Sequence, residues 1–189
     1  MKAERKDYDR VTDVLAPLAQ LHKVPADKLE NARRRGSAVD EAIEFHMAGI
    51  PHNTLPDEWK PYLESAKLWL EDKKIWKQKE RLYEDQYALT GEFDCIRQTT
   101  DGLVIIDFKA TYGEGATWPL QGAAYAFLAD QSFRSESFIG IEFVHLDKLG
   151  RAPKVYKYDK FENLDTFFDC LSIYRKFWKN KRPEDLDYL

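Results

Sequence analysis

The sequence predicts an α/β fold in which helices flank a central β-sheet. A short apolar run at residues 103–106 follows an Asp-Gly turn signal, which is typical of a strand buried on both faces. Two alternating segments, 138–146 and 154–158, indicate a further hairpin. Residues 57–72 and 163–179 carry apolar side chains at helical spacing, which indicates amphipathic helices that cover a core.

The composition describes one folded domain. The chain has 189 residues, which is enough for a single sizeable core. Of these residues, 43% are hydrophobic and 33% are charged, and this balance excludes a mainly disordered chain. We expect a single domain over residues 1–189, with an N-terminal helical part at about 8–74 and a sheet–helix core at about 75–180.

The sequence also restricts the compartment and the cofactors. No run approaches the roughly 20 apolar residues that span a bilayer, and the N-terminal residues 1–6 are not followed by an apolar signal region. We therefore expect a cytoplasmic protein without a membrane partner. Cys95 and Cys170 lack a metal-ligand spacing, so we expect reduced thiols, no zinc site and no iron–sulfur cluster.

The net charge of −4 argues against nucleic-acid binding by bulk electrostatics, so any contact with a polyanion must be local. Three basic clusters can provide such a contact, although a solvated face is the commoner role of such clusters. They are Arg33, Arg34 and Arg35; Lys73, Lys74, Lys77, Lys79 and Arg81; and Arg175, Lys176, Lys179, Lys181 and Arg182.

The spacing of apolar residues and turn signals predicts each element in turn. In chain order, these are helices at 8–21, 25–49 and 57–72, a strand at 75–83, a hairpin of strands at 86–98 and 103–110, a helix from Trp118, a hairpin at 138–146 and 154–158, and a helix at 163–179. Thr12 or Asp13 caps the first helix, and Pro17 disturbs its interior. Pro183 ends the last helix.

The helix at 25–49 contains a glycine and two acids on one face. Gly36 lies in its interior, where glycine costs roughly 1 kcal/mol relative to alanine, so it marks a break or the close approach of another backbone or a ligand. Asp40 and Glu44 follow at intervals of one turn on the same face. These acids face either the sheet or solvent, and the sequence leaves both alternatives open.

Charged side chains gather at the far end of the central strand. Asp107 and Lys109 are two residues apart, so they project from the same face of a strand. The turn at 99–102 folds the preceding strand back and brings Asp94 toward Asp107. Glu80 on the first strand can face the same edge. Convergent carboxylates are ligands that Mg²⁺ prefers, whereas the alternative is a surface ion pair of little energetic value.

The segment after the central strand adds polar and aromatic groups. Residues 112–117 form a glycine-rich loop, but it lacks the Gly-Lys-Ser/Thr of a nucleotide phosphate loop. Trp118 and Pro119 begin a helix with a face of small residues that can pack close to a sheet. Gln121 and Tyr125 are four residues apart on this helix and point together. An ordinary half-buried aromatic residue is an equal alternative for Tyr125.

In this order, the motifs resemble the RecB-like branch of the PD-(D/E)XK nuclease superfamily, which includes phage and CRISPR-associated exonucleases. The resemblance rests on Val11-Thr-Asp-Val-Leu15, Arg35-Gly-Ser-Ala-Val-Asp40, Glu80, Gly91-Glu-Phe-Asp94, Ile106-Asp-Phe-Lys109 and Gln121-Gly-Ala-Ala-Tyr125. It implies a restriction-endonuclease-like fold with a mixed β-sheet core flanked by helices. The chain departs from the family's Arg-Gly-x-x-x-His pattern, because Asp40 stands in place of the histidine. His46 lies six residues later, on a different face of the helix.

The resemblance also implies the roles of individual residues. The metal, one or two Mg²⁺ or Mn²⁺ ions, would be bound by Asp94, Asp107, Asp40 and the backbone carbonyl of Phe108; the catalytic set would be Asp94, Asp107, Lys109, Glu80, Gln121 and Tyr125; and DNA would contact Arg35, Tyr112, Trp118, Gln121 and Tyr125. Within these sets, Lys109 would orient water or stabilise charge. Tyr112 or Trp118 would stack on bases.

We therefore expect a metal-dependent deoxyribonuclease that hydrolyses phosphodiester bonds at single-stranded or duplex DNA ends. The resemblance favours an exonuclease in recombination, repair or processing, in a phage or mobile-element setting and with a protein partner in such a complex. It leaves a structure-specific endonuclease open. One alternative is a catalytically inactive nucleic-acid-binding or scaffold subunit in which Asp40 marks a dead site. Another is a structural interaction protein whose acids diverge in space.

Overall fold

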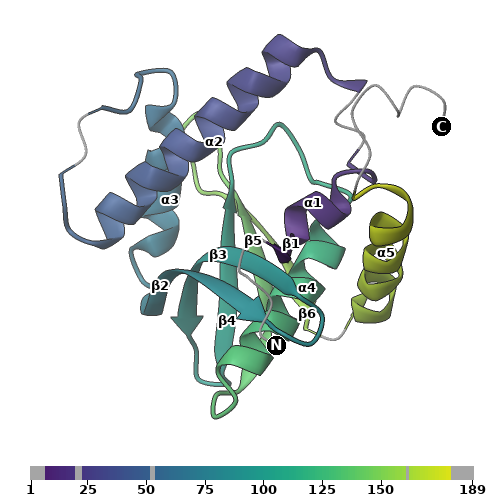
Figure 1. Ribbon diagram of the computed structural model, residues 1–189. Coiled ribbons are helices and arrows are strands. Elements are labelled where there is room, and N and C mark those ends of the chain that lie inside the picture. Colours follow the sequence, from purple (N-terminus) through teal and green to yellow (C-terminus); the bar gives the residue numbers. More distant parts are fainter. Residues whose placement is uncertain (1–6, 20–22, 52–53, 161, 180–189) are drawn as a thin grey trace.

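The computed structural model describes residues 7–19, 23–51, 54–160 and 162–179 (Figure 1). Its elements are β1 (Asp9–Arg10), α1 (Val11–Leu15), α2 (Ala26–Met47), α3 (Lys60–Leu70), β2 (Lys74–Glu84), β3 (Leu89–Gln98), β4 (Leu103–Lys109), α4 (Trp118–Ser132), β5 (Phe138–His145), β6 (Lys154–Asp159) and α5 (Leu164–Phe177). Lys181, Arg182 and the predicted helix stop Pro183 lie outside the described residues. Among the helices described, none has both the length and the apolar character needed to cross a bilayer.

Within the described ranges, the strands form one mixed sheet of six strands. Its order is β1-β3-β4-β5-β6, and β2 also pairs with β3. The two predicted hairpins are confirmed, because β3 pairs antiparallel with β4, and β5 with β6. β4 and β5 run parallel, and α4 supplies the crossover connection that a parallel pair needs. The predicted α/β class with a mixed sheet is therefore confirmed.

Helices cover both faces of the sheet (Figure 1). α1, α4 and α5 pack on one face, and α2 and α3 pack on the other. Strand β4 supplies side chains to both cores, with Ile105 on the α4 side and Ile106 on the α2 side, and neither is exposed. The apolar run thus forms a strand buried on both faces, as predicted.

Helix α4 lies close to the sheet because its contact face is small. A Cβ built on Gly122 would stand only 2.6 Å from Cγ2 of Ile141 on β5. Ala123, Ala124 and Ala126 are buried on the same helix. This close packing confirms the role predicted for the small residues, and it holds the polar residues of the first turns of α4 against the sheet.

The N-terminal segment differs from the prediction. Its first residues form the short strand β1, which pairs in parallel with β3, so the part predicted to be helical also contributes to the sheet. The helix α1 begins later than predicted, at Val11, and ends at Leu15 before Pro17. The predicted caps Thr12 and Asp13 therefore lie inside the helix rather than at its start.

A buried carboxylate explains why this segment joins the sheet. Asp9 is 4% exposed, and its two oxygens lie 2.7 Å from Nε of Arg175 and 2.8 Å from Nζ of Lys179. Both cations come from the end of α5 and the residues just after it. The three charges tie β1 to the last helix, a long-range pairing that the spacing of apolar residues does not reveal.

Helix α2 continues through Gly36 without a break. Apart from its chain neighbours and the nearby backbone of α2, no atom of the described residues lies within 4 Å of a Cβ built at Gly36. Neither a helix break nor the close approach of another protein backbone accounts for this glycine. Open space therefore remains beside α2 one turn before Asp40.

Candidate active site

Asp107 and Lys109 project from one face of β4 at its end, as the two-residue spacing predicts. Nζ of Lys109 lies 2.5 Å from Oδ2 of Asp107. The side chains are 19% and 7% exposed, respectively, so this pair is not the surface ion pair considered as an alternative. The backbone of Lys109 is fixed as well, because its carbonyl accepts a 3.0 Å hydrogen bond from the N–H of Leu146.

Asp94 reaches the same place from β3. The β3–β4 ladder ends at the pair Cys95–Ile106, one residue before Asp94 would face Asp107. Beyond that point Oδ2 of Asp94 accepts a 2.6 Å hydrogen bond from the N–H of Phe108. A side-chain carboxylate thus takes over from the backbone ladder. This explains how an acid comes to lie between the ends of two central strands.

Asp40 adds a third carboxylate, from α2. Its pKa is raised from 3.8 to about 7, first by burial and then by the charge of Asp107. The pKa of Asp94 is raised well above its usual range by burial and then by Asp107 and Asp40. Burial also raises the pKa of Asp107, whereas Lys109 lowers it. The structure therefore brings together three of the predicted metal ligands, which repel one another when ionised.

The donor set suits a hard dication. Carboxylate and carbonyl oxygens are the ligands that Mg²⁺ and Mn²⁺ take. Over the residues that the structure describes, no three His, Cys, Asp or Glu side chains stand close enough together to hold a metal ion. Asp107 instead binds Lys109, and Asp94 binds the N–H of Phe108. A dication among the three aspartates would offset their mutual repulsion, so their chemistry fits a metal.

Phe108 contacts the site through its backbone N–H, which donates to Asp94. Its ring lies on the α2 side of the sheet, where it packs edge-on against Trp69 at 5.5 Å between ring centroids. Asp107 and Lys109, as its neighbours along the strand, project to the opposite face. The backbone N–H of Phe108 binds Asp94, and the predicted role of its carbonyl as a metal ligand stays a prediction.

Gln121 and Tyr125 lie together on α4, as their spacing predicts. Nε2 of Gln121 donates a 2.9 Å hydrogen bond to the phenol oxygen of Tyr125, and the two residues are 6% and 4% exposed. The pKa of Tyr125 is raised well above its usual range by burial and then by the charge of Asp107. The phenol therefore stays protonated beside the aspartates and belongs to the same site.

With this geometry established, comparison with known proteins identifies the family. The model of a family described as the PD-(D/E)XK nuclease superfamily matches residues 11–182. The chain belongs to the PD-(D/E)XK nuclease superfamily. The three aspartates, Lys109, Gln121 and Tyr125 of this PD-(D/E)XK protein all lie within the matched range.

Two other comparisons add little. None of the curated proteins compared with this PD-(D/E)XK protein is similar to it. A solved structure titled "Crystal structure of SSO0001" shares 15% sequence identity with it at a TM-score of 0.40. That similarity covers 96% of this chain and 81% of the other. A likeness of this size supports no conclusion about activity.

Glu80 of this PD-(D/E)XK protein forms an ion pair on its own strand. It pairs with Phe93 across the β2–β3 ladder, and cross-strand partners share a face of the sheet. Its Oε2 lies 3.0 Å from Nζ of Lys77. Phe93 is part of the core under α4, and Lys77 lies over the ring of Phe133 near the end of that helix. Asp107 also projects to the α4 side of the sheet, so Glu80 shares its face, and the catalytic role of Glu80 stays a prediction.

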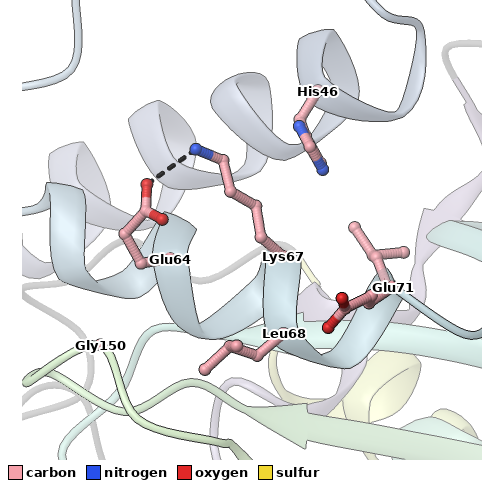
Figure 2. Close-up of a pocket in the computed structure, with 7 residues that line it drawn as sticks. His46, Glu64, Lys67, Leu68, Glu71 and Gly150 are labelled. Atoms are coloured by element: carbon pink, nitrogen blue, oxygen red, sulfur yellow. Dashed lines mark hydrogen bonds and ion pairs between the residues drawn. The ribbon is translucent and has the colours of Figure 1, made fainter.

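His46 lies on a different face of α2 from Asp40, as its position six residues later predicts. It is exposed and lines a cavity of about 400 Å³ between α2 and α3 (Figure 2). Glu64, Lys67 and Glu71 of α3 line the same cavity, and Lys67 binds Glu64 at 2.7 Å. None of the predicted site residues lines this cavity, so His46 does not replace the missing family histidine.

The predicted DNA-contact residues have different environments. Arg35 is 6% exposed, and its Nε donates a 2.9 Å hydrogen bond to the carbonyl of Ala110, directly after Lys109. Tyr112 is 83% exposed. Trp118 is only 4% exposed and stacks on the core residue Phe143 at 5.3 Å, so its ring offers no face to a base. Of the two aromatic residues, only Tyr112 is accessible for the predicted stacking.

The sequence analysis missed a chain of ion pairs beside the aspartates. Nζ of Lys79 lies 2.6 Å from Glu44 and 3.7 Å from Glu92, and Arg81 lies 2.8 Å from Glu92. The charge of Lys79 lowers the pKa of Asp40. The alternation of Lys79 and Arg81 along a strand could have indicated that both project from one face. Their acidic partners on α2 and β3 could not be read from spacing.

Proposed function

We propose that this protein is a divalent-metal-dependent deoxyribonuclease of the RecB-like branch that acts as an exonuclease. The observation that supports the proposal most strongly is the convergence of Asp40, Asp94 and Asp107 beside Lys109. In a nuclease fold, a buried carboxylate whose charge raises the pKa of two partly buried carboxylates is better explained by cation binding than by stability.

Each of these residues would have a defined role. A Mg²⁺ or Mn²⁺ ion held by the three aspartates would supply an activated water and polarise the phosphoryl group. Burial lowers the pKa of Lys109, but the charge of Asp107 more than offsets this effect, so the pKa of Lys109 is raised. The ammonium group therefore remains protonated and can donate hydrogen bonds to water or to a phosphoryl oxygen at the site.

The polar pair on α4 would position the DNA strand. Because Gln121 donates to the phenol oxygen of Tyr125, the phenol can direct its own proton elsewhere, for example to a phosphate oxygen. Phosphate contacts of this kind place the strand without reading its sequence. Since the net charge of the chain is −4, binding would depend on such local contacts and fall steeply with salt.

Digestion of labelled DNA tests the proposal. End-labelled single-stranded, duplex and circular DNA would be incubated with the protein and Mg²⁺ or Mn²⁺ in turn. We expect degradation of linear DNA, no attack on circles, and no activity in EDTA. Asp107→Ala and Lys109→Ala should abolish or strongly reduce cleavage. Asp130→Asn serves as the matched control, because Asp130 forms a carboxylate–lysine pair with Lys160 at 3.1 Å.

The result also separates the alternatives. Failure of the wild-type protein to cut any DNA with either metal would refute the nuclease proposal. Tight DNA binding without cleavage would then favour the inactive binding or scaffold subunit. In that case Asp40, which stands in place of the family histidine, would account for the lost activity. Cleavage of circular DNA would show that the protein acts as an endonuclease and not as an exonuclease. A complex with a recombination or processing partner belongs to the same proposal and would be sought with the active protein.

A further inference from the structure

Tyr112 is an unusually exposed aromatic residue beside the candidate active site. It is 83% exposed, more than any other large hydrophobic residue for which exposure is described. It lies three residues after Lys109, on the glycine-rich loop that follows β4. An exposed ring at this place is free to stack on a base that enters the site.

The ring of Tyr112 is nevertheless held in place. The guanidinium carbon of Arg35 lies 5.0 Å from the centroid of the Tyr112 ring and 5.6 Å from that of Tyr62. Arg35 itself is buried and bonded to the carbonyl of Ala110. The guanidinium thus attaches the exposed ring to the fixed end of β4. A cation–π contact of this kind orients the ring in advance, so little conformational entropy remains to be lost on binding.

Space and positive charge surround this ring. Apart from chain neighbours and the nearby backbone of the same helix, no described atom lies within 4 Å of a Cβ built on Gly36, next to Arg35, or on Gly113, next to Tyr112. Tyr112 also lines a cavity of about 230 Å³ together with Lys148, Lys154 and Asp147, and the carboxylate of Asp147 is bound by Arg151. An accessible aromatic ring with lysines beside it combines the two features by which proteins bind single-stranded nucleic acid, a stacking surface and charge for the phosphates.

We infer that Tyr112 is a stacking platform for an unpaired base, so the substrate of this site is a single strand or a duplex end with unpaired nucleotides. This inference rests on the proposed nuclease function and adds its substrate class. Two residues separate Tyr112 from Lys109, so their Cα atoms are at most about 11 Å apart. The stacked base would therefore lie only a few nucleotides from the phosphate at Lys109.

A binding cycle tests the stacking. Fluorescein-labelled single-stranded oligonucleotides, intact or with one abasic site at each position in turn, would be titrated in EDTA and followed by anisotropy. Tyr112→Ala should weaken binding of the intact strand roughly 5- to 100-fold, whereas Tyr112→Phe should bind within about twofold of wild type. Phe177→Ala is the control. The ring of Phe177 is also exposed and lies under the ammonium group of a neighbouring lysine, but it is at the end of α5.

The abasic scan distinguishes stacking from a general loss of affinity. One abasic position should weaken binding to wild type but not to Tyr112→Ala, since the two changes remove the same contact. With Mg²⁺ or Mn²⁺, wild type should digest a duplex with a three-nucleotide overhang faster than a blunt duplex, and Tyr112→Ala should remove most of that difference.

Two results would overturn the inference: equal affinity of Tyr112→Ala and wild type, or equal rates on blunt and overhanging duplexes. Failure of the nuclease function has a different signature. A wild-type protein that cuts no DNA but still shows the Tyr112-dependent abasic effect in EDTA would retain the binding site and lose only the reaction, because the binding cycle needs no turnover.

Discussion

Replacement of Asp40 by asparagine should make the stability of the metal-free protein less dependent on pH. Asparagine keeps the size of the side chain but removes the charge. The pKa of Asp40 is raised from 3.8 to about 7, so the folded protein keeps this proton at pH values where the unfolded chain has lost it. The neutral carboxyl therefore favours folding at low pH, and that contribution disappears as pH rises toward 7.

The expected size follows from the pKa of Asp40. From pH 5 to pH 8 the folded state loses a proton at this residue that the unfolded state has almost entirely lost already, which corresponds to about 2.6 kcal/mol. Asp40 is only partly buried, and solvent relaxation reduces such effects, so we take just over half of this, ~1.5 kcal/mol. In a domain of this size, that amounts to a change in Tm of about 3–6 °C.

Thermal unfolding in EDTA at pH 5, 6, 7 and 8 measures the effect. The Tm of wild type minus that of Asp40→Asn should fall by about 3–6 °C from pH 5 to pH 8, because titration of the histidines cancels in the difference. Asp130→Asn, which removes a carboxylate outside the cluster, should show no such trend. Added Mn²⁺ should stabilise wild type at pH 8 more than the variant. A Tm difference that stays constant or rises with pH would refute the electrostatic coupling of Asp40 to the other aspartates.

Three further variants test other parts of the structure. Lys109→Ala should lower the single-turnover cleavage rate about 10²- to 10³-fold while DNA affinity changes little, and an equal fall in both would assign Lys109 to binding instead. Gly122→Val should destabilise the fold by about 1–3 kcal/mol in urea titrations, because a Cβ at this position stands 2.6 Å from Ile141, whereas Gly36→Ala should be neutral or stabilising by up to ~1 kcal/mol. Asp9→Ala should cost about 1–3 kcal/mol, and its loss should be smaller when Arg175 is also replaced, which a double-mutant cycle measures.

Local patterns were sufficient for the central hairpin and for the pair on β4. The apolar run and its Asp-Gly turn predict the strand at 103–110, and the structure has it at Leu103–Lys109. Within that strand, the two-residue repeat fixes Asp107 and Lys109 on one face whatever the rest of the chain does. Gln121 and Tyr125 are set in the same way by the four-residue spacing of a helix. Each of these predictions needs only the geometry of one element.

Sequence spacing does not determine the contacts between two different secondary-structure elements. Sequence spacing places Asp40 and Glu44 on one face of α2, but whether that face meets the sheet depends on where the helix crosses it. In the structure, Asp40 joins the aspartates, whereas Glu44 reaches Lys79 on β2. The position of Glu80 depends on two elements in the same way. Its register opposite Phe93 decides its face, and register is set by the whole β2–β3 ladder.

Packing decides which of the two aromatic residues near the glycine-rich loop is buried in the core and which is accessible at the site. Tyr112 and Trp118 are equally plausible stacking residues in the sequence. In the structure, Gly115 lies so close to the indole that a Cβ there would stand 2.3 Å from Nε1 of Trp118, whereas Gly113 has open space around it. One glycine lets the loop close over Trp118, and the other leaves the loop clear of Tyr112. Because the loop covers Trp118, Tyr112 is left as the aromatic side chain that an incoming strand can meet.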